Sequence, residues 1–348
     1  MPFVSAFAIL PYRLALRRPW RSARGTVTHR EGFLVRLDTA EGPVGFGDCA
    51  PLPGHGTETA AEALAALEEM RGGFRGGPVQ GLMAGLVHRR PRNPAACCAV
   101  ETACIDLLAQ DKHKPLRRYL QPQAGNRVKV NGVVGGLDDG APDRAAGLLA
   151  EGYRVLKVKL GIADWPEELE RLRALPEGAL LRLDANGAWT AEQTRTAIAD
   201  LADLPIEALE EPCATADMVT LAALQDAAPF AIALDESLIR LGPEAVIAAR
   251  PVKRLVLKPA VLGSLGLARF LGHRARAAGM EAVVTTALDS AVGVLAACQV
   301  AAAIDIDGTL AHGLSTSSWL AEDVGQAPAV ENGTLRLPEL PGLGFIPR

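Results

Sequence analysis

The chain has 348 residues, of which 49% are hydrophobic and 22% are charged. This length suggests one large domain or two smaller ones, and the composition excludes a disordered chain. The formal net charge of −4 provides no basic surface for nucleic acid, so an anionic substrate must be met by local positive groups.

No targeting or membrane-spanning segment is predicted. Residues 1–11 lack the basic start, apolar run and cleavage site of a signal peptide, and the longest apolar stretch, residues 291–304, is too short to cross a bilayer. The six cysteines contain no Cys-x-x-Cys pair, and three of them fall in an apolar helical stretch where buried free thiols are expected. These three are Cys97, Cys98 and Cys104. We therefore expect a cytoplasmic protein with no membrane partner.

The first 122 residues are predicted to form an α+β domain. The expected elements are strands at residues 32–37 and 45–49 around a turn at 41–43, a helix at 57–70, a loop at 71–78 and a helix at 94–110. The first helix begins with a threonine as its N-cap and acidic residues after it. The second has Asn93 as its N-cap and Pro94 at the first helical position.

From residue 123 onward, strands and helices alternate regularly. Seven apolar runs begin about 23 to 27 residues apart, and each gap contains a helical segment such as residues 191–202 or 265–278. This alternation predicts a parallel sheet, and an eighth strand near residues 304–310 favours a closed barrel. The seven predicted strands are residues 128–134, 155–160, 180–184, 206–210, 231–235, 254–258 and 281–286.

Charged residues gather at one end of these strands. A charge in the middle of a parallel strand buried on both faces is costly, whereas active sites of such barrels lie at the carboxyl ends of the strands. Five successive strands each carry a charge there, which predicts a functional site. The residues are Lys157 and Lys159 late in the second strand, followed by Asp184, Glu210, Asp235 and Lys258 at the ends of the third to sixth strands.

The three carboxylates predict a hard oxygen site suited to Mg²⁺, and the absence of histidine and cysteine from the set argues against zinc. Lys157 and Lys159 point to the same side of their strand. Two ammonium groups near a divalent cation should lower the pKa of a lysine and make it a general base. Lys258 should face Lys159 across the mouth. This arrangement suits abstraction of a proton next to a carboxylate, because the metal can take up the developing charge.

Each residue has a simpler interpretation when it is considered alone. A single Asp or Lys at a strand end is more often a helix cap or a surface charge, and Asn186 and Thr190 could be turn and cap residues. Glu211 and Glu236 alternate to the other face and are interpreted as structural. The combined set favours the functional interpretation.

These segments resemble the enolase superfamily, and within it the muconate-lactonizing subgroup. The matching runs are residues 156–159, 182–189, 209–212, 234–237 and 257–259. Within the subgroup, residues 182–189, 210–213 and 258–264 are most similar to the o-succinylbenzoate synthase family, as is the early run at residues 50–54. The resemblance covers nearly the whole chain, and its motifs are specific in combination.

The resemblance implies a modified TIM barrel, (β/α)₇β, in the α/β class. It also implies an N-terminal α+β capping domain that the C-terminal tail completes. The corresponding ranges are residues 1–122 for the capping domain, 123–318 for the barrel and 319–348 for the returning tail. The implied partner is a small-molecule carboxylate, namely a succinyl-hydroxycyclohexadiene carboxylate that is dehydrated to o-succinylbenzoate on the way to menaquinone or phylloquinone.

The resemblance also implies a role for each site residue. Asp184, Glu210 and Asp235 would bind Mg²⁺, with Mn²⁺ as a substitute, and Asn186 would support these ligands. Lys159 would remove the α-proton and return it to the departing hydroxyl, while Lys157 and Lys258 would stabilise the enediolate. Arg182 would assist the succinyl carboxylate, and Thr285 and Thr286 would line the substrate.

Other functions share these catalytic residues. An N-succinylamino-acid racemase, a dipeptide epimerase and a cycloisomerase all need an enolate between two lysines. The run from Asp305 to Asp307 is similar to the Asp-x-Asp with which dipeptide epimerases hold a peptide amine, but we interpret it as structural. The expected discriminators are the eighth-strand end and the capping loops at residues 17–25 and 54–58.

An alternative of another class is a non-catalytic metal-binding barrel. A nicotinamide or flavin enzyme lacks support, because no Gly-x-Gly-x-x-Gly follows a strand and opens a helix. A homo-oligomer is compatible with the sequence, which leaves the oligomeric state open.

Overall fold

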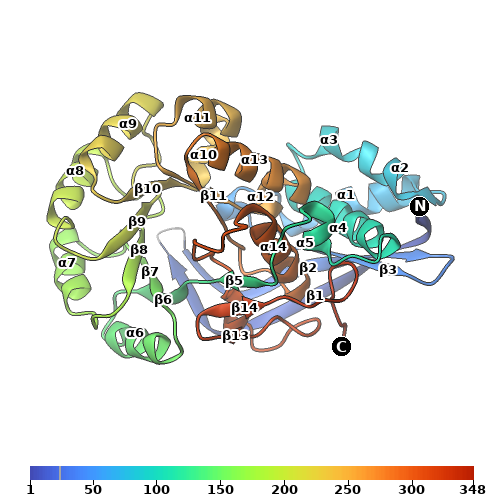
Figure 1. Ribbon diagram of the computed structural model, residues 1–348, viewed down its shortest axis with the longest axis horizontal. Helices are drawn as coiled ribbons and strands as arrows, with labels where there is room; N and C mark the ends of the chain where they lie inside the picture. Colours follow the sequence, from blue (N-terminus) through green and yellow to red (C-terminus); the bar gives the residue numbers. More distant parts are fainter. Residues whose placement is uncertain (23–24) are drawn as a thin grey trace.

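The computed structural model describes residues 1–22 and 25–348. It comprises an N-terminal domain of strands and helices beside a larger α/β barrel (Figure 1). The N-terminal sheet has the order β3-β2-β1-β4. Its strands are β1 (Phe3–Ser22), β2 (Gly25–Thr39), β3 (Val44–Cys49) and β4 (Gly77–Pro78), and its helical segments are η1 (Pro53–His55), α1 (Ala60–Gly73), α2 (Val79–Ala84), α3 (Leu86–Arg89), α4 (Pro94–Asp111) and α5 (Leu116–Leu120).

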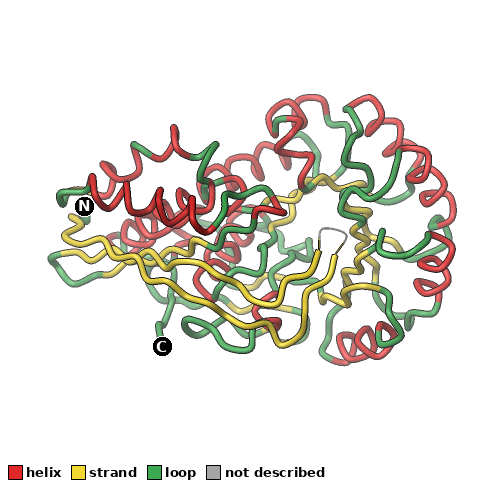
Figure 2. The backbone as a smooth tube through the Cα atoms, turned by 180° about the vertical axis from the view of Figure 1, so that it is seen from behind, coloured by secondary structure: helices red, strands yellow, loops and turns green. Residues whose placement is uncertain are grey.

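Helix α4 packs closely on this sheet because two glycines of β3 carry no side chain. A Cβ at Gly47 would overlap the carbonyl group of Ala99, and one at Gly45 would overlap that of Ala103. Figure 2 shows the long β1–β2 hairpin extending from this domain toward the opening of the barrel. The capping domain therefore supplies part of the wall of the barrel mouth.

Strand β1 has no counterpart among the predicted elements. Its run contains Pro11 and Pro19 together with several arginines, a composition that argues against a long strand. The pairing with β2 nevertheless continues beyond both prolines, with a register shift between Ala15 and Trp20. The shift places residues 16–19 outside the regular β1–β2 ladder. Pro19, which has no N–H, therefore does not have to donate a ladder hydrogen bond.

One helix start differs from its predicted cap, and another has the predicted N-cap residue and Pro94 at its first position but a different hydrogen-bond acceptor. The N-cap of α1 is Thr59 rather than Thr57, in a capping box with Glu62, so the helix runs from residue 60 to 73 and includes the start of the predicted loop. Asn93 does precede α4, but its side chain makes no capping bond. The carboxylate of Glu58 accepts from the amides of Ala95 and Ala96 instead, at 3.0 and 2.9 Å.

The barrel contains a seven-stranded parallel sheet in the order β12-β11-β10-β9-β8-β7-β6, with helices outside it (Figure 1). The strands are β6 (Gly132–Gly136), β7 (Val155–Lys159), β8 (Leu180–Asp184), β9 (Ile206–Glu210), β10 (Ala231–Leu234), β11 (Arg254–Leu257) and β12 (Glu281–Val284). The helices are α6 (Ala141–Ala150), α7 (Trp165–Arg173), α8 (Ala191–Asp200), α9 (Met218–Ala227), α10 (Glu236–Leu241), α11 (Pro243–Ala249), α12 (Pro259–Leu262), α13 (Leu265–Ala277) and α14 (Ala291–Ile304).

The prediction of an eighth strand near residues 304–310 was wrong in position. Ile304 ends α14, and the parallel bridges that close the sheet are Val130 with His312 and Thr285 with Gly313. Residues 312–313 bond on one side to the backbone of residues 129 and 131, and on the other to that of residues 284 and 286. The eighth position is therefore only two residues long, too short to produce a period in the sequence.

The first predicted strand, residues 128–134, is divided in two. β5 (Arg127–Lys129) pairs with the C-terminal strand β14 (Thr334–Arg336), which itself pairs with β13 (Val330–Glu331), while β6 joins the barrel. The tail then returns to the capping domain, where the amide of Leu116 donates to the carbonyl of Gly342 and the ring of Phe345 meets that of Phe46. The C-terminal segment thus completes the capping domain.

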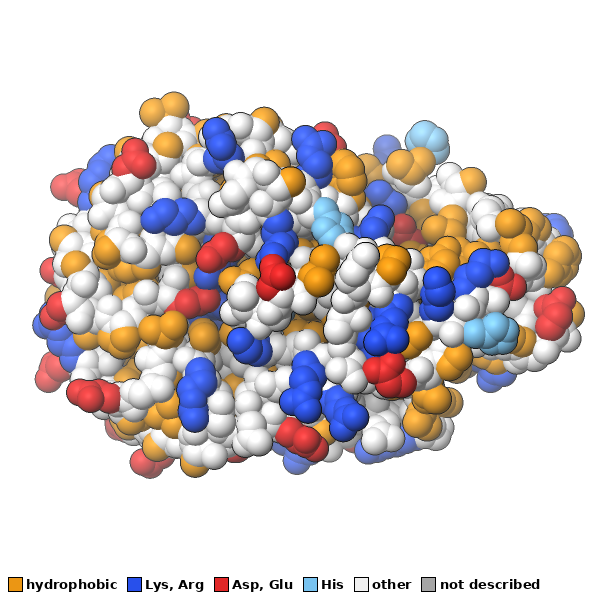
Figure 3. Space-filling model, viewed as in Figure 1, with side chains coloured by type: hydrophobic (Ala, Val, Ile, Leu, Met, Phe, Trp, Pro, Cys, Tyr) orange, Lys and Arg blue, Asp and Glu red, His pale blue; other side chains and the backbone are white. Residues whose placement is uncertain are grey.

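The six cysteines are all buried and free, as predicted for Cys97, Cys98 and Cys104. Within the described residues, no helix combines the length and apolarity needed to cross a membrane. On the face seen in Figure 3, acidic and basic side chains are interspersed and form no continuous basic surface.

Candidate active site

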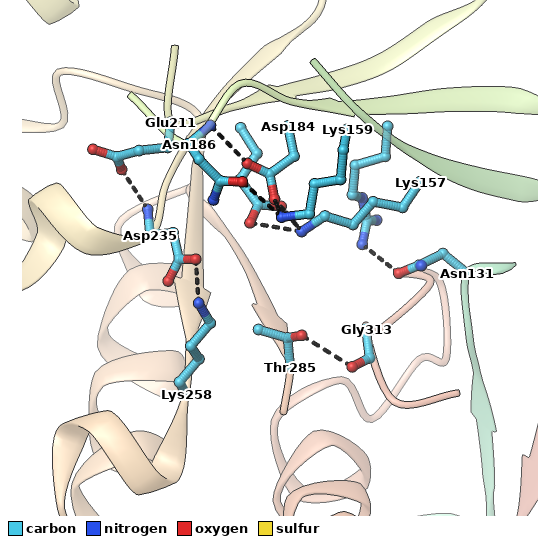
Figure 4. A network of polar contacts seen from close by, with 12 residues as sticks. Asn131, Lys157, Lys159, Asp184, Asn186, Glu211, Asp235, Lys258, Thr285 and Gly313 are labelled. Carbon is cyan, nitrogen blue, oxygen red and sulfur yellow. Dashed lines mark hydrogen bonds and ion pairs between the residues drawn. The ribbon is translucent and has the colours of Figure 1, made fainter. Parts of the chain in front are cut away.

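The predicted charged residues lie together at the carboxyl ends of β7 to β11 (Figure 4). Neighbouring strands are in register there, so Lys159 lies beside Asp184, and Asp184 beside Glu210. Asp184 and Glu210 are nearly inaccessible to solvent, at 1% and 2% exposure, and Asp235 is also buried. Regular pairing of parallel strands thus brings together groups that are about 25 residues apart in the chain.

Lys157 and Lys159 both point to the same side of β7, as their spacing predicted. The Nζ atom of Lys157 lies 2.8 Å from both carboxylate oxygens of Glu210 and 2.8 Å from Oδ2 of Asp184. The Nζ atom of Lys159 lies 2.6 Å from the same Oδ2 atom and donates to Oδ1 of Asn186 at 2.9 Å. Two ammonium groups therefore converge on one carboxylate.

Lys258 lies on the other side of the site and forms an ion pair with Asp235 (Figure 4). The side chains of Lys157, Lys159 and Lys258 line one cavity of about 50 Å³ together with Asp184 and Asp235. The two predicted sides of the site, one with a lysine pair and one with a lone lysine, therefore face a shared space.

Our prediction of a lowered lysine pKa concerns the site with a divalent cation bound and stays a prediction, whereas the protein groups alone raise the pKa of two of the lysines. Burial acts to lower the pKa of Lys157, but Asp184 and Glu210 outweigh it and raise the pKa above its ordinary value. For Lys258, Asp235 and Glu236 likewise outweigh burial and raise the pKa. For these two lysines, carboxylates in direct contact with the ammonium groups outweigh burial.

The pKa values of Asp184 and Glu210 shift in opposite directions. Burial acts to raise the pKa of Asp184, but the ammonium groups of Lys157 and Lys159 hold it well below its usual range. The pKa of Glu210 is raised, first by burial and then by the nearby charges of Asp184 and Asp235. The three predicted metal ligands are thus close enough to repel one another.

The carboxylates are turned toward the lysines. Within residues 1–22 and 25–348, no three His, Cys, Asp or Glu side chains are grouped as the ligands of a metal ion would be. Asp184 and Glu210 face Lys157, and Asp235 faces Lys258. A cation bound by all three carboxylates would have to compete with these ammonium groups for the same oxygen atoms.

Of the predicted substrate residues, Thr285 and Thr286 line the cavity and Arg182 does not. The hydroxyl of Thr285 donates to the carbonyl of Gly313 at 2.9 Å, and that of Thr286 shares a hydrogen bond with Thr316. Arg182 lies two residues below the end of β8, inside the barrel. There its guanidinium pairs with Glu207 and donates to the carbonyl of Ala311 at 2.8 Å.

Asn186 follows β8 with a left-handed φ of 47°. Its amide donates to Oδ1 of Asp184 at 3.0 Å while its side chain accepts from Lys159. The strained backbone and both bonds orient Asp184 relative to Lys159. This contact extends beyond the turn and cap role considered for Asn186 alone.

Comparison with known proteins adds evidence for the family. Residues 141–348 match the model of the enolase C-terminal domain-like family. Residues 6–120 match the N-terminal domain of the mandelate racemase and muconate lactonizing enzymes. The chain belongs to the enolase superfamily.

The relatives of this superfamily enzyme differ in activity. It is 29% identical to an o-succinylbenzoate synthase from Desulfotalea psychrophila, with 94% of this chain and 98% of that protein covered. It is 31% identical to an L-Lys-D/L-Arg epimerase from Methylococcus capsulatus, with 95% of each covered. An o-succinylbenzoate synthase from Mycobacterium tuberculosis is 38% identical over 225 residues, 62% of this chain and 65% of that protein.

Solved structures agree on the fold. A dipeptide epimerase from Methylococcus capsulatus, complexed with Mg and the dipeptide L-Arg-D-Lys, is 30% identical and has a TM-score of 0.89. That alignment covers 99% of this chain and 100% of that one. The fold and family are therefore shared by enzymes with different reactions.

Several wall residues of this superfamily site were not predicted individually. Leu52 and His55 come from the capping domain, and Trp20 from the end of β1. His55 and Trp20 fall in the two capping loops that we expected to discriminate substrates, but Ala23 and Arg24 of the first loop lie outside the described residues. Asn131, between β5 and β6, also lines the cavity and has no local sequence signal.

Proposed function

We propose that this enzyme is an o-succinylbenzoate synthase. It would dehydrate 2-succinyl-6-hydroxy-2,4-cyclohexadiene-1-carboxylate to 2-succinylbenzoate in menaquinone or phylloquinone biosynthesis, in the cytoplasm. In this reaction a C–H and a C–O bond break, a C=C bond forms and water leaves. Support comes from the family, from the lysines on both sides of the cavity and from the synthases among its relatives.

The placement of Asp305 and Asp307 favours a synthase over a dipeptide epimerase. Both carboxylates pair with Arg276, in the last turn of α13. The helices run antiparallel to the strands, so this position is at the amino end of the barrel, away from the lysines. The end of the eighth position carries Gly313, Ser315 and Thr316. It therefore has no carboxylate to hold a peptide amine.

The metal ligands of this proposal are Asp184, Glu210 and Asp235. All their donors are oxygen atoms on adjacent strand ends, a set that suits Mg²⁺ or Mn²⁺ once the ion pairs with lysine open. When bound, the cation would stabilise negative charge on the substrate carboxylate.

The lysines carry the proton transfers in this proposal. Lys159 removes the α-proton and then delivers a proton to the departing hydroxyl, for which it lies at the surface of the cavity. Lys157 and Lys258 act as ammonium groups on the two sides of the cavity, where they stabilise the negative charge that develops between them.

A substrate panel tests the proposal. The purified protein is offered the succinyl-hydroxycyclohexadiene carboxylate beside N-succinylamino acids and dipeptides, each with Mg²⁺ and after exhaustive chelation. We expect metal-dependent dehydration that is restored by adding Mg²⁺. Racemisation of N-succinylamino acids without dehydration, epimerisation of dipeptides, or no turnover of any compound would each contradict the synthase assignment. Full activity after chelation would contradict the metal role.

A further inference from the structure

A second and larger cavity adjoins the site. Its volume is about 400 Å³, against about 50 Å³ for the space around the lysines. Lys159 and Trp20 belong to the walls of both cavities, so the two meet at these side chains. The smaller space holds only a few water molecules. A substrate with a reacting carbon beside Lys159 must therefore extend part of its structure elsewhere.

Most charged groups around the second cavity are already satisfied by the protein. Arg144 pairs with Asp138 at 2.7 Å and donates to the carbonyls of Val134 and Gly136. The carboxylate of Glu168 accepts three backbone N–H groups of the segment 161–163, at 2.9 to 3.1 Å. Neither group needs a ligand to compensate its charge.

Arg18 differs from these groups. Its guanidinium lies 4.1 Å from the ring centroid of Trp319, in a cation–π contact, and it lines the second cavity. Among the residues that the structure describes, it makes no hydrogen bond or ion pair. The five N–H donors of this guanidinium are therefore available to an anion that enters the cavity.

The position of Arg18 is set by the segment after the eighth barrel position. The helical turn η2 (Thr316–Trp319) presents Trp319, whose ring contacts that of Trp20 edge-on at 4.7 Å. Next to Arg18, Arg17 donates to the carbonyl of Leu320 at 2.9 Å. These contacts on both sides of Arg18 orient the guanidinium before any ligand binds.

We propose that this cavity is a subsite for a second carboxylate of the substrate, bound by Arg18. The inference rests on the proposed function. The carboxylate next to the reacting carbon would occupy the side with Asp184 and Asp235, and the rest of the molecule would pass Trp20 to reach Arg18. The enzyme would then select dicarboxylates, such as a succinyl compound, over analogues with a neutral end.

Binding of the reaction product separates this subsite from a structural role. We compare 2-succinylbenzoate with 2-butyrylbenzoate, in which a methyl group replaces the distal carboxylate, by calorimetry in the presence of Mg²⁺. We expect wild-type protein to prefer the succinyl compound by about 10- to 100-fold, the usual effect of a charged hydrogen bond. Arg18→Met should abolish the preference, and Arg18→Lys should restore part of it.

The matched control is Arg13→Met, which removes a positive charge from the same strand at an exposed site and should leave the preference unchanged. If Arg18→Met weakens the binding of both compounds by the same factor, so that the preference for the succinyl compound remains, the proposed subsite is wrong. The same holds if the substitution changes neither affinity. These results are independent of the proposed function, which fails separately if wild-type protein dehydrates no succinyl-hydroxycyclohexadiene carboxylate. A wild-type protein that binds both compounds equally would also overturn the subsite.

Discussion

Asp184 contacts both lysines of β7, and the partners that the two lysines do not share distinguish their roles. Lys157 contacts Asp184 and both oxygens of Glu210, whereas Lys159 contacts Asp184 and the neutral amide of Asn186. Lys157 therefore has two anionic partners and Lys159 has one. Lys159 therefore has fewer ion pairs to break before its amino group can turn toward a substrate, and this favours Lys159 as the base.

Substitution Lys159→Ala should lower kcat for dehydration by about 10²- to 10⁴-fold, the usual contribution of a general base. The fold should persist, because Lys157 still compensates the charge of Asp184 at 2.8 Å. Steady-state kinetics and a melting curve measure the two effects. Lys253→Ala, an exposed lysine just before β11, is the control. Unchanged kcat in Lys159→Ala would show that another group is the base.

At the scale of elements, one buried arginine joins two loops that line the site. Arg30 of β2 donates to the carbonyls of Ala50 and Pro51 after β3, and to that of Leu288 after β12, at 2.7 to 3.1 Å. Leu288 has a left-handed φ of 60°, which is unfavourable for a branched side chain. The bond from Arg30 therefore helps to hold a strained cavity wall in place.

Arg30→Met should lower the free energy of unfolding by roughly 1–3 kcal/mol, because three buried carbonyls lose their donor. It should also lower kcat/KM for the succinyl substrate, since the walls around Leu52 and Leu288 would no longer be fixed. Urea unfolding and kinetics measure these effects. Arg36→Met, on the same strand but exposed and paired with half-buried Asp38, should change stability by less than about 0.5 kcal/mol. Equal effects of the two variants would remove the special role of Arg30.

At the scale of the whole molecule, buried acids lie where the capping domain meets the barrel. Asp48 of β3 accepts from the hydroxyl of Tyr12 at 2.7 Å and from the amide of Ser290 at 2.9 Å. Burial, and next the charge of Asp48, raises the pKa of neighbouring Asp289 to about 7. Asp48 thus joins two parts of the fold, and beside it lies Asp289, a carboxyl group whose pKa is raised to about 7.

This carboxyl group should make stability depend on pH. The unfolded chain loses the proton near the ordinary pKa of 3.8, whereas the folded protein keeps it to about pH 7. The folded state therefore binds more protons between these values, and stability falls as the pH rises through this window. Compared with the wild type, Asp289→Asn should raise the free energy of unfolding more at pH 8 than at pH 5, by on the order of 1 to 4 kcal/mol.

Urea unfolding at several pH values between 5 and 8 measures this effect. The control is Asp203→Asn, which alters an exposed ion pair with Arg173 and should shift stability equally at all these pH values. A pH profile for Asp289→Asn that runs parallel to that of the wild type would contradict the raised pKa.

The barrel and the residues of its charged site could be predicted from the amino-acid pattern alone. Strand β8 and strand β9 lie at their predicted residues, and β10, β11 and β12 differ only at their ends. This succeeded because buried parallel strands exclude charge except at their ends, and because parallel pairing repeats the same geometry on each strand. Asp184, Glu210, Asp235 and the three lysines therefore had to meet.

Features that depend on distances between remote segments could not be predicted from the sequence and are seen in the folded chain. The eighth position at residues 312–313 is formed by bridges on both sides and has no period of its own. Arg182 lies below the cavity because its partner Glu207 comes from the next strand. The pKa values of Lys157 and Lys258 rise because carboxylates from other strands touch them. Arg18 faces a cavity because Trp319, about 300 residues later, supports it. None of these contacts is encoded by local spacing.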